Sequence, residues 1–182
     1  GEMIGDQIAD LGDIDGGGSP DLGIGRRSTG GGATGLAYIL RGEAIPTLPT
    51  SATVDSRSWV RFTGTGGDVC PCRVISPGDL NDDGQPDVRV SASRAGLGGV
   101  DAGALYLFYG GSIPSGGGDI ALSSADQIFI GEPGSRAGAA MAPGGDINGD
   151  GIDDVIIGAP GFSPTGALSG AGGVFIFTGF AP

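Results

Sequence analysis

The sequence contains one nine-residue acidic pattern three times, at almost equal intervals. The pattern occurs as Asp13–Asp21, again 66 residues later as Asp79–Asp87, and 67 residues after that as Asp146–Asp154. Each copy carries several oxygen-bearing side chains and is followed by a short apolar run. A fixed period of this length is typical of repeat proteins, in which each period forms one supersecondary unit. We therefore expect three similar units stacked side by side.

The third copy of the pattern is a candidate calcium loop. Carboxylate or amide oxygens stand at its positions 1, 3, 5 and 9, and Gly151 at position 6 permits a tight turn. The helix–loop–helix calcium motif needs a Glu at position 12, but Ile157 stands there and Val155–Pro160 has the pattern of a buried strand. The loop is therefore expected to join two strands. The alternative is a polar turn without an ion, but repulsion among its carboxylates favours a counter-ion.

The surroundings of the loop also recur and predict four strands in a full period. A short segment precedes each loop, an apolar strand follows it, and a glycine-rich turn leads to an aromatic strand and a fourth strand. The 41 glycines and 12 prolines favour such short strands and tight turns. We predict an all-β fold of β-propeller type with blades at residues 1–66, 67–133 and 134–182, the third lacking its outer strand. The expected aromatic strands are 36–40, 105–109 and 174–177, and the expected fourth strands are 59–62 and 127–130.

These repeats resemble the FG-GAP repeats of integrin alpha-subunit propellers. Gly158-Ala159-Pro160 stands where that family has its Gly-Ala-Pro triplet, and Gly145–Gly151 matches its calcium loop without a gap. The resemblance implies calcium ligands from side chains and from one backbone carbonyl in each loop. In the third and second loops these are Asp146, Asn148, Asp150, the Ile152 carbonyl, Asp154, Asp79, Asn81, Asp83, the Gln85 carbonyl and Asp87.

The first repeat departs from this pattern. Gly17 occupies position 5, so the implied ligands are only Asp13, Asp15, Asp21 and the carbonyl of Ser19. We expect two calcium sites and a third that the missing carboxylate weakens. The Gly-Ala-Pro triplet is also replaced in the first two repeats, by Gly25-Arg26-Arg27 and Ser91-Ala92-Ser93, which should alter local packing rather than the fold.

Composition argues against several classes of function. The formal net charge is −12, whereas nucleic acids and anionic membranes reward clustered positive charge. Histidine is absent, which removes the commonest general base and argues against an enzyme, including a metal-assisted one. No apolar stretch is long enough for membrane insertion. Weak calcium loops suit the millimolar calcium outside cells, so an extracellular or cell-surface location is expected.

The number of repeats bears on function, because a closed propeller needs about four to eight blades. Three blades leave open sheet edges, which favour self-association into a head-to-tail fibre or a propeller completed by other copies. The leading hypothesis is therefore a calcium-stabilised structural or adhesion module. The alternative is a glycan-binding or protein-binding propeller module of a larger cell-surface protein.

Four further features of the sequence allow both a purely structural role and a functional one. Gly30–Gly35 formally fits a dinucleotide fingerprint but lacks a following helix pattern, so we interpret it as a turn. Cys70 and Cys72 are too close for an unstrained bridge and are expected to be free or intermolecular thiols.

The loop with Thr47, Thr50, Ser51 and Thr53 is a solvated connection or an O-glycan carrier. Trp59 is expected in the core, with sugar stacking as the alternative.

Overall fold

The computed structural model describes residues 2–28, 36–47, 51, 53–64, 68–75, 78–164 and 170–179. Several predictions of the sequence analysis fall on other residues or on side chains outside this description. They are the turn at 30–35, the side chains of Cys70 and Cys72, Thr50, and residues 166–169 of the glycine-rich turn that precedes the third aromatic strand. Within the described residues, no helix is long and apolar enough to cross a membrane.

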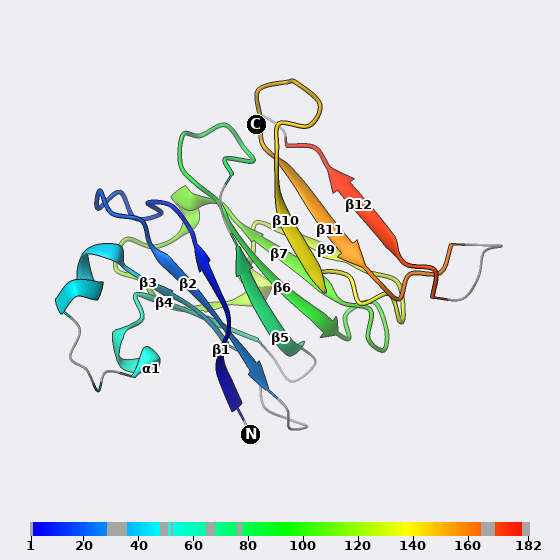
Figure 1. Ribbon diagram of the computed structural model, residues 1–182, viewed down its shortest axis with the longest axis horizontal. Helices are drawn as coiled ribbons and strands as arrows, with labels where there is room; N and C mark the ends of the chain where they lie inside the picture. Colours follow the sequence, from blue (N-terminus) through cyan, green and yellow to red (C-terminus); the bar gives the residue numbers. More distant parts are fainter. Residues whose placement is uncertain are drawn as a thin grey trace.

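The fold is all-β, with three antiparallel sheets side by side in chain order (Figure 1). The first contains β1 (Glu2–Asp10), β2 (Leu22–Ser28), β3 (Leu36–Leu40) and β4 (Val60–Thr63). The second contains β5 (Asp68–Ile75), β6 (Val88–Ala95), β7 (Ala104–Phe108) and β9 (Gln127–Ile130). The third contains β10 (Ala140–Gly145), β11 (Asp154–Ala159) and β12 (Gly173–Phe177).

The all-β prediction is confirmed, and the described strands lie at or within a few residues of the expected positions. Among the described residues, β12 pairs only with β11, which agrees with a third sheet of three strands. The sheets formed by these described strands do not close into a barrel. The short helical segments are η1 (Gly42–Thr47), α1 (Val54–Arg57), η2 (Gly110–Ser112) and η3 (Leu122–Ser124).

The hydrophobic core consists of layers between neighbouring sheets. Strand β7 is buried on both faces, so it has a continuous apolar sequence instead of an alternating one. Tyr106 and Phe108 belong to the layer shared with the first sheet, where the rings of Phe62 and Phe108 lie 4.7 Å apart. Leu105 and Leu107 belong to the layer shared with the third sheet. Each sheet therefore depends on its neighbour for burial.

One strand was not predicted from the sequence. Strand β8 (Gly118–Ala121) lies in the connection between β7 and β9 and pairs in parallel with β4 of the first sheet. Arg61 of β4 forms an ion pair with Asp119 of β8. A single residue pair, Arg27 with Pro71, also joins β2 to β5, so the first two sheets form one nine-stranded sheet. The first and second repeats are thus linked by backbone hydrogen bonds as well as by the core.

The outer faces of the array differ at its two ends. On the first sheet, Ile24, Tyr38 and Leu40 are buried and pack with Val54 of α1. On the third sheet, side chains of β12 alternate between the core and solvent. Phe175 and Phe177 pack toward the second sheet, whereas Val174 and Ile176 are 70% and 54% exposed. One end is covered and the other presents apolar side chains.

Candidate metal centre

The three acidic loops occupy equivalent places in the fold. Each joins the first strand of a sheet to the second, and all three lie at the same end of the sheets (Figure 1). Position 6 of the loops is Gly18, Gly84 or Gly151, with φ of 86°, 83° and 92°. These values lie in the left-handed region that glycine adopts without a steric penalty. The predicted turn geometry is therefore present in all three copies.

The aspartate at position 1 organises each loop through the loop's own backbone. In the third loop, Asp146 Oδ1 accepts hydrogen bonds from Gly149 N at 2.6 Å and Asp150 N at 3.0 Å. Its Oδ2 accepts from Gly151 N at 2.8 Å. Asp79 makes the corresponding bonds to Asp83 and Gly84. Such local bonds fold the loop around its oxygen-bearing side chains.

Positions 3 and 5 interact with each other at the exposed mouth of the second and third loops. Asn148 Oδ1 accepts from Asp150 N at 3.0 Å, and Asn148 Nδ2 donates to Asp150 Oδ2 at 2.7 Å. Asn81 and Asp83 form the same pair in the second loop. The structure thus brings together the predicted side chains at positions 1, 3 and 5.

The aspartate at position 9 is a buried connector as well as a predicted ligand. Asp21, Asp87 and Asp154 are at most 1% exposed. One oxygen of each accepts a hydrogen bond from the N–H at position 2 of its own loop. The other accepts from a glycine N–H two residues after the third strand of the sheet. These aspartates therefore link each loop to a third strand, a role that the sequence analysis did not predict.

Steric crowding explains the glycines that donate to these aspartates. They are Gly42, Gly110 and Gly179. A Cβ at these positions would lie 2.1 Å from the carbonyl oxygen of Pro20, 2.5 Å from that of Pro86 and 2.4 Å from that of Asp153. No side chain fits at such distances, so only glycine brings its N–H close to the buried carboxylate. The glycine two residues beyond each aromatic strand was the available sequence signal for this contact.

The electrostatics of the loops suit a cation. Burial raises the pKa of Asp87 to about 6, with smaller contributions from Asp83 and Asp79, although the hydrogen bonds from Leu80 and Gly110 lower it. Burial also raises the pKa of Asp21. In the first loop, oxygens of Asp13, Asp15 and Asp21 lie within 4.8 Å of one another. A positive charge nearby would stabilise the ionised form of such carboxylates.

The donor set fits calcium by its chemistry, because every predicted ligand is an oxygen atom. Calcium accepts carboxylate, amide and carbonyl oxygens, whereas zinc prefers nitrogen and sulfur. Asp146, Asn148, Asp150 and Asp154 would hold it in the third loop, and Asp79, Asn81, Asp83 and Asp87 in the second. Ligation by the carbonyls of Ser19, Gln85 and Ile152 stays a prediction.

The second and third loops touch each other through Asp153. Its Oδ2 accepts a hydrogen bond from Asp79 N at 3.2 Å, and its N–H donates to Asp79 O at 3.3 Å. Arg89, which is fully buried, lies beneath this contact. A Cβ on Gly78 would lie 3.1 Å from Asp153 Oδ2 and 3.4 Å from Arg89 Nη2. Burial lowers the pKa of Arg89, while the carboxylates of Asp153 and Asp87 raise it.

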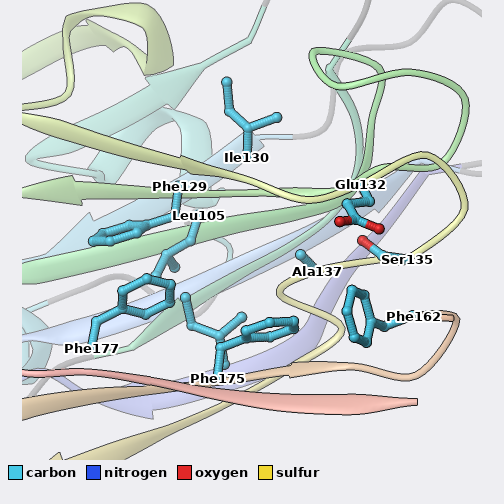
Figure 2. Close-up of a pocket in the computed structure, with 10 residues that line it drawn as sticks. Leu105, Phe129, Ile130, Glu132, Ser135, Ala137, Phe162, Phe175 and Phe177 are labelled. Carbon is cyan, nitrogen blue, oxygen red and sulfur yellow. The ribbon is translucent and has the colours of Figure 1, made fainter. Parts of the chain in front are cut away.

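A cavity of about 240 Å³ lies between the second and third sheets. Figure 2 shows the rings of Phe129, Phe162, Phe175 and Phe177 around it, with the polar groups of Glu132 and Ser135 grouped at one side. A second hollow of about 350 Å³ lies along β12, lined by Leu80, Leu107, Gln127, Phe129, Val155, Ile176, Phe177, Thr178 and Gly179. Apolar surface is therefore open beside the last strand of the third sheet.

Comparison with known families identifies the second and third repeats. The FG-GAP repeat family matches residues 73–108 and 137–177. The matched ranges include the second and third acidic loops with the strands around them. No curated protein matches the chain.

Proposed function

Because this chain is an FG-GAP repeat protein, we propose that it is a calcium-stabilised structural or adhesion module of β-propeller type that acts outside the cell. The observation that carries the proposal is the shared construction of the second and third loops, in which oxygen-bearing side chains at positions 1, 3 and 5 accompany a buried aspartate at position 9. A hydrogen-bonded turn alone does not require acidic side chains at positions 1, 5 and 9 together. Calcium is the ion that such oxygen sets bind most readily.

Calcium would stabilise more than the loop itself. It would neutralise the carboxylates and hold positions 1, 3, 5 and 9 together. The position 9 aspartate also accepts a hydrogen bond from the N–H of a residue that follows the third strand of its sheet, as Asp154 does from Gly179. An ion in the loop would therefore help to hold three strands together: the two that the loop joins and the third strand of the same sheet. Its role in this proposal is structural, with no reaction assigned to it.

Calcium is expected to raise the melting temperature of the protein, and the Asp83→Asn variant should lose part of that gain. At a calcium concentration of about 100 times Kd, each site adds about 2.7 kcal/mol to the free energy of unfolding. Scanning calorimetry with calcium and with chelator measures the effect.

The matched control is Asp82→Asn, which changes the same charge at the adjacent residue. Asp82 is exposed and has φ of 57°, a conformation that asparagine tolerates. Its calcium response should equal that of the natural protein. Equal melting temperatures with calcium and with chelator in the natural protein would contradict the proposal.

The proposed module also self-associates through its third sheet. Strand β12 pairs only with β11 among the described residues, and its own side chains Val174 and Ile176 are exposed. An apolar strand with an unpaired edge favours pairing with another chain. Successive copies that add at this end would build a head-to-tail fibre or complete a propeller.

The Ile176→Lys substitution is expected to weaken self-association at least about tenfold, because burying an isoleucine contributes about 1.5–3 kcal/mol. Sedimentation velocity over a concentration series in calcium measures it. Val100→Lys is the control, since Val100 is 85% exposed in a turn of the second repeat, outside β12. A calcium-loaded protein that stays monomeric at every concentration would refute self-association.

A second candidate function is the binding of a protein ligand. The phenylalanine-lined cavity between the second and third sheets favours it, because an apolar side chain of a partner would bury the rings that line this space. A glycan, by contrast, needs more polar groups than the described lining of this cavity offers.

A further inference from the structure

We propose that Arg41 is the resident cation of the first loop and takes the place that calcium has in the second and third loops. This inference rests on the proposed function, because it concerns which of the three loops depend on calcium. It predicts two calcium ions for each chain, although three acidic loops are present.

The first observation is an ion pair inside the acidic cluster. Arg41 Nε lies 2.7 Å from Asp15 Oδ2, and the side chain of Asp15 is only 5% exposed. Asp15 belongs to the cluster with Asp13 and Asp21, whose oxygens lie within 4.8 Å of one another. The guanidinium therefore supplies positive charge where the other loops would receive it from an ion.

The second observation comes from comparing the three repeats of the same chain. The residue directly after the third strand of each sheet is Arg41, Tyr109 or Thr178. The only cation at this position is in the repeat that has Gly17 in place of a position 5 aspartate. Position 3 differs too, since it is Asp15 in the first loop and asparagine in the others. Both partners of the ion pair are thus specific to the repeat with the altered loop.

The third observation is that the arginine is held in place. Its guanidinium lies 4.7 Å from the ring centroid of Trp59, and its Nη2 donates a hydrogen bond to the Ser115 carbonyl at 2.7 Å. Trp59 Nε1 donates to the same carbonyl at 3.2 Å. Stacking and a fixed partner reduce the entropy lost when a guanidinium binds a carboxylate. Trp59 is partly buried and packs against the core, as expected from the sequence, and its ring also supports Arg41.

The ion pair also opposes calcium binding in the first loop. A divalent ion among Asp13, Asp15 and Asp21 would face the guanidinium at close range, and like charges repel strongly in a partly buried site. Gly17 offers no side-chain ligand. A further carboxylate, that of Glu43, has its Oε2 3.0 Å from the place that a Cβ on Gly17 would take. Arg41 therefore offsets part of the negative charge of the first loop and ties this loop to the second repeat through Ser115.

Calcium stoichiometry tests this assignment. Native mass spectrometry should find two calcium ions bound to each chain of the natural protein and three bound to each chain of the Arg41→Gln variant. In chelator, Arg41→Gln should melt about 3–6 °C lower than the natural protein, as expected for a loss of one partly buried ion pair. Arg57→Gln removes the same charge from the exposed end of α1 and should change neither quantity.

The outcomes separate this inference from the proposed function. Three calcium ions in the natural protein, or an unchanged melting temperature of Arg41→Gln in chelator, would overturn the role of Arg41. No bound calcium at all would overturn the proposed function, while the melting comparison in chelator would still decide the ion pair. If Arg41→Gln does not fold, Arg41→Lys keeps the charge and should retain two calcium ions with a smaller melting shift.

Discussion

The calcium-free protein is expected to lose about 3 kcal/mol of its free energy of unfolding as the pH rises from about 4 to about 6. Burial raises the pKa of Asp87 to about 6 in the folded protein, whereas an unfolded aspartate has a pKa of about 3.9. Between these values the folded state binds a proton that the unfolded state has released. The stabilisation is therefore complete below about pH 4 and is lost as the pH passes about 6.

Urea unfolding across this pH range, in calcium-depleted buffer, measures the loss. Asp87→Asn should reduce the pH dependence by most of that amount, whereas Asp82→Asn should leave it unchanged. If Asp87→Asn does not fold, a carbon NMR titration of the Asp87 carboxyl in the natural protein gives its pKa directly. Equal pH dependence in the natural protein and Asp87→Asn would show that Asp87 ionises normally. Calcium should remove the effect, because it favours the ionised carboxylate.

The strands and loops could be predicted from the sequence because their signals are local and repeated. The loop glycines, such as Gly151, have the left-handed φ that the pattern required. The aromatic strands lie where expected because apolar runs bounded by glycine favour short strands. Repetition strengthened each signal, since a feature found three times at one spacing is not an accident of composition.

The contacts between repeats could not be predicted in the same way, because they depend on residues far apart in the sequence. Strand β8 has a weak pattern of its own and is fixed by its pairing with β4. Asp87 has the spacing of a metal ligand, but nothing near it in sequence shows that Gly110 donates to its second oxygen. Arg41 lies outside every acidic loop, and only the fold brings it to Asp15.

The Asp153→Asn substitution is expected to lower the free energy of unfolding by about 3 kcal/mol, because it removes a counter-charge from the buried Arg89. Asparagine keeps an oxygen that can accept the hydrogen bond from Asp79 N, so the variant tests charge rather than hydrogen bonding. Urea unfolding measures the loss. The control is Asp119→Asn, which breaks the exposed ion pair with Arg61 and should cost at most about 1 kcal/mol.

A double variant decides whether Arg89 and Asp153 act as a pair. The corresponding positions hold Gly23 and Pro20 in the first repeat, and Ile156 is the counterpart of Arg89 in the third. The strand position thus accepts an apolar residue elsewhere in the chain, so Arg89→Met combined with Asp153→Asn should recover much of the stability lost in Asp153→Asn alone. If the double variant loses as much free energy of unfolding as Arg89→Met and Asp153→Asn lose separately when summed, the two side chains act independently. Recovery would show that the two charges are coupled across the second and third repeats, so that Asp153 stabilises the protein mainly by compensating the buried charge of Arg89.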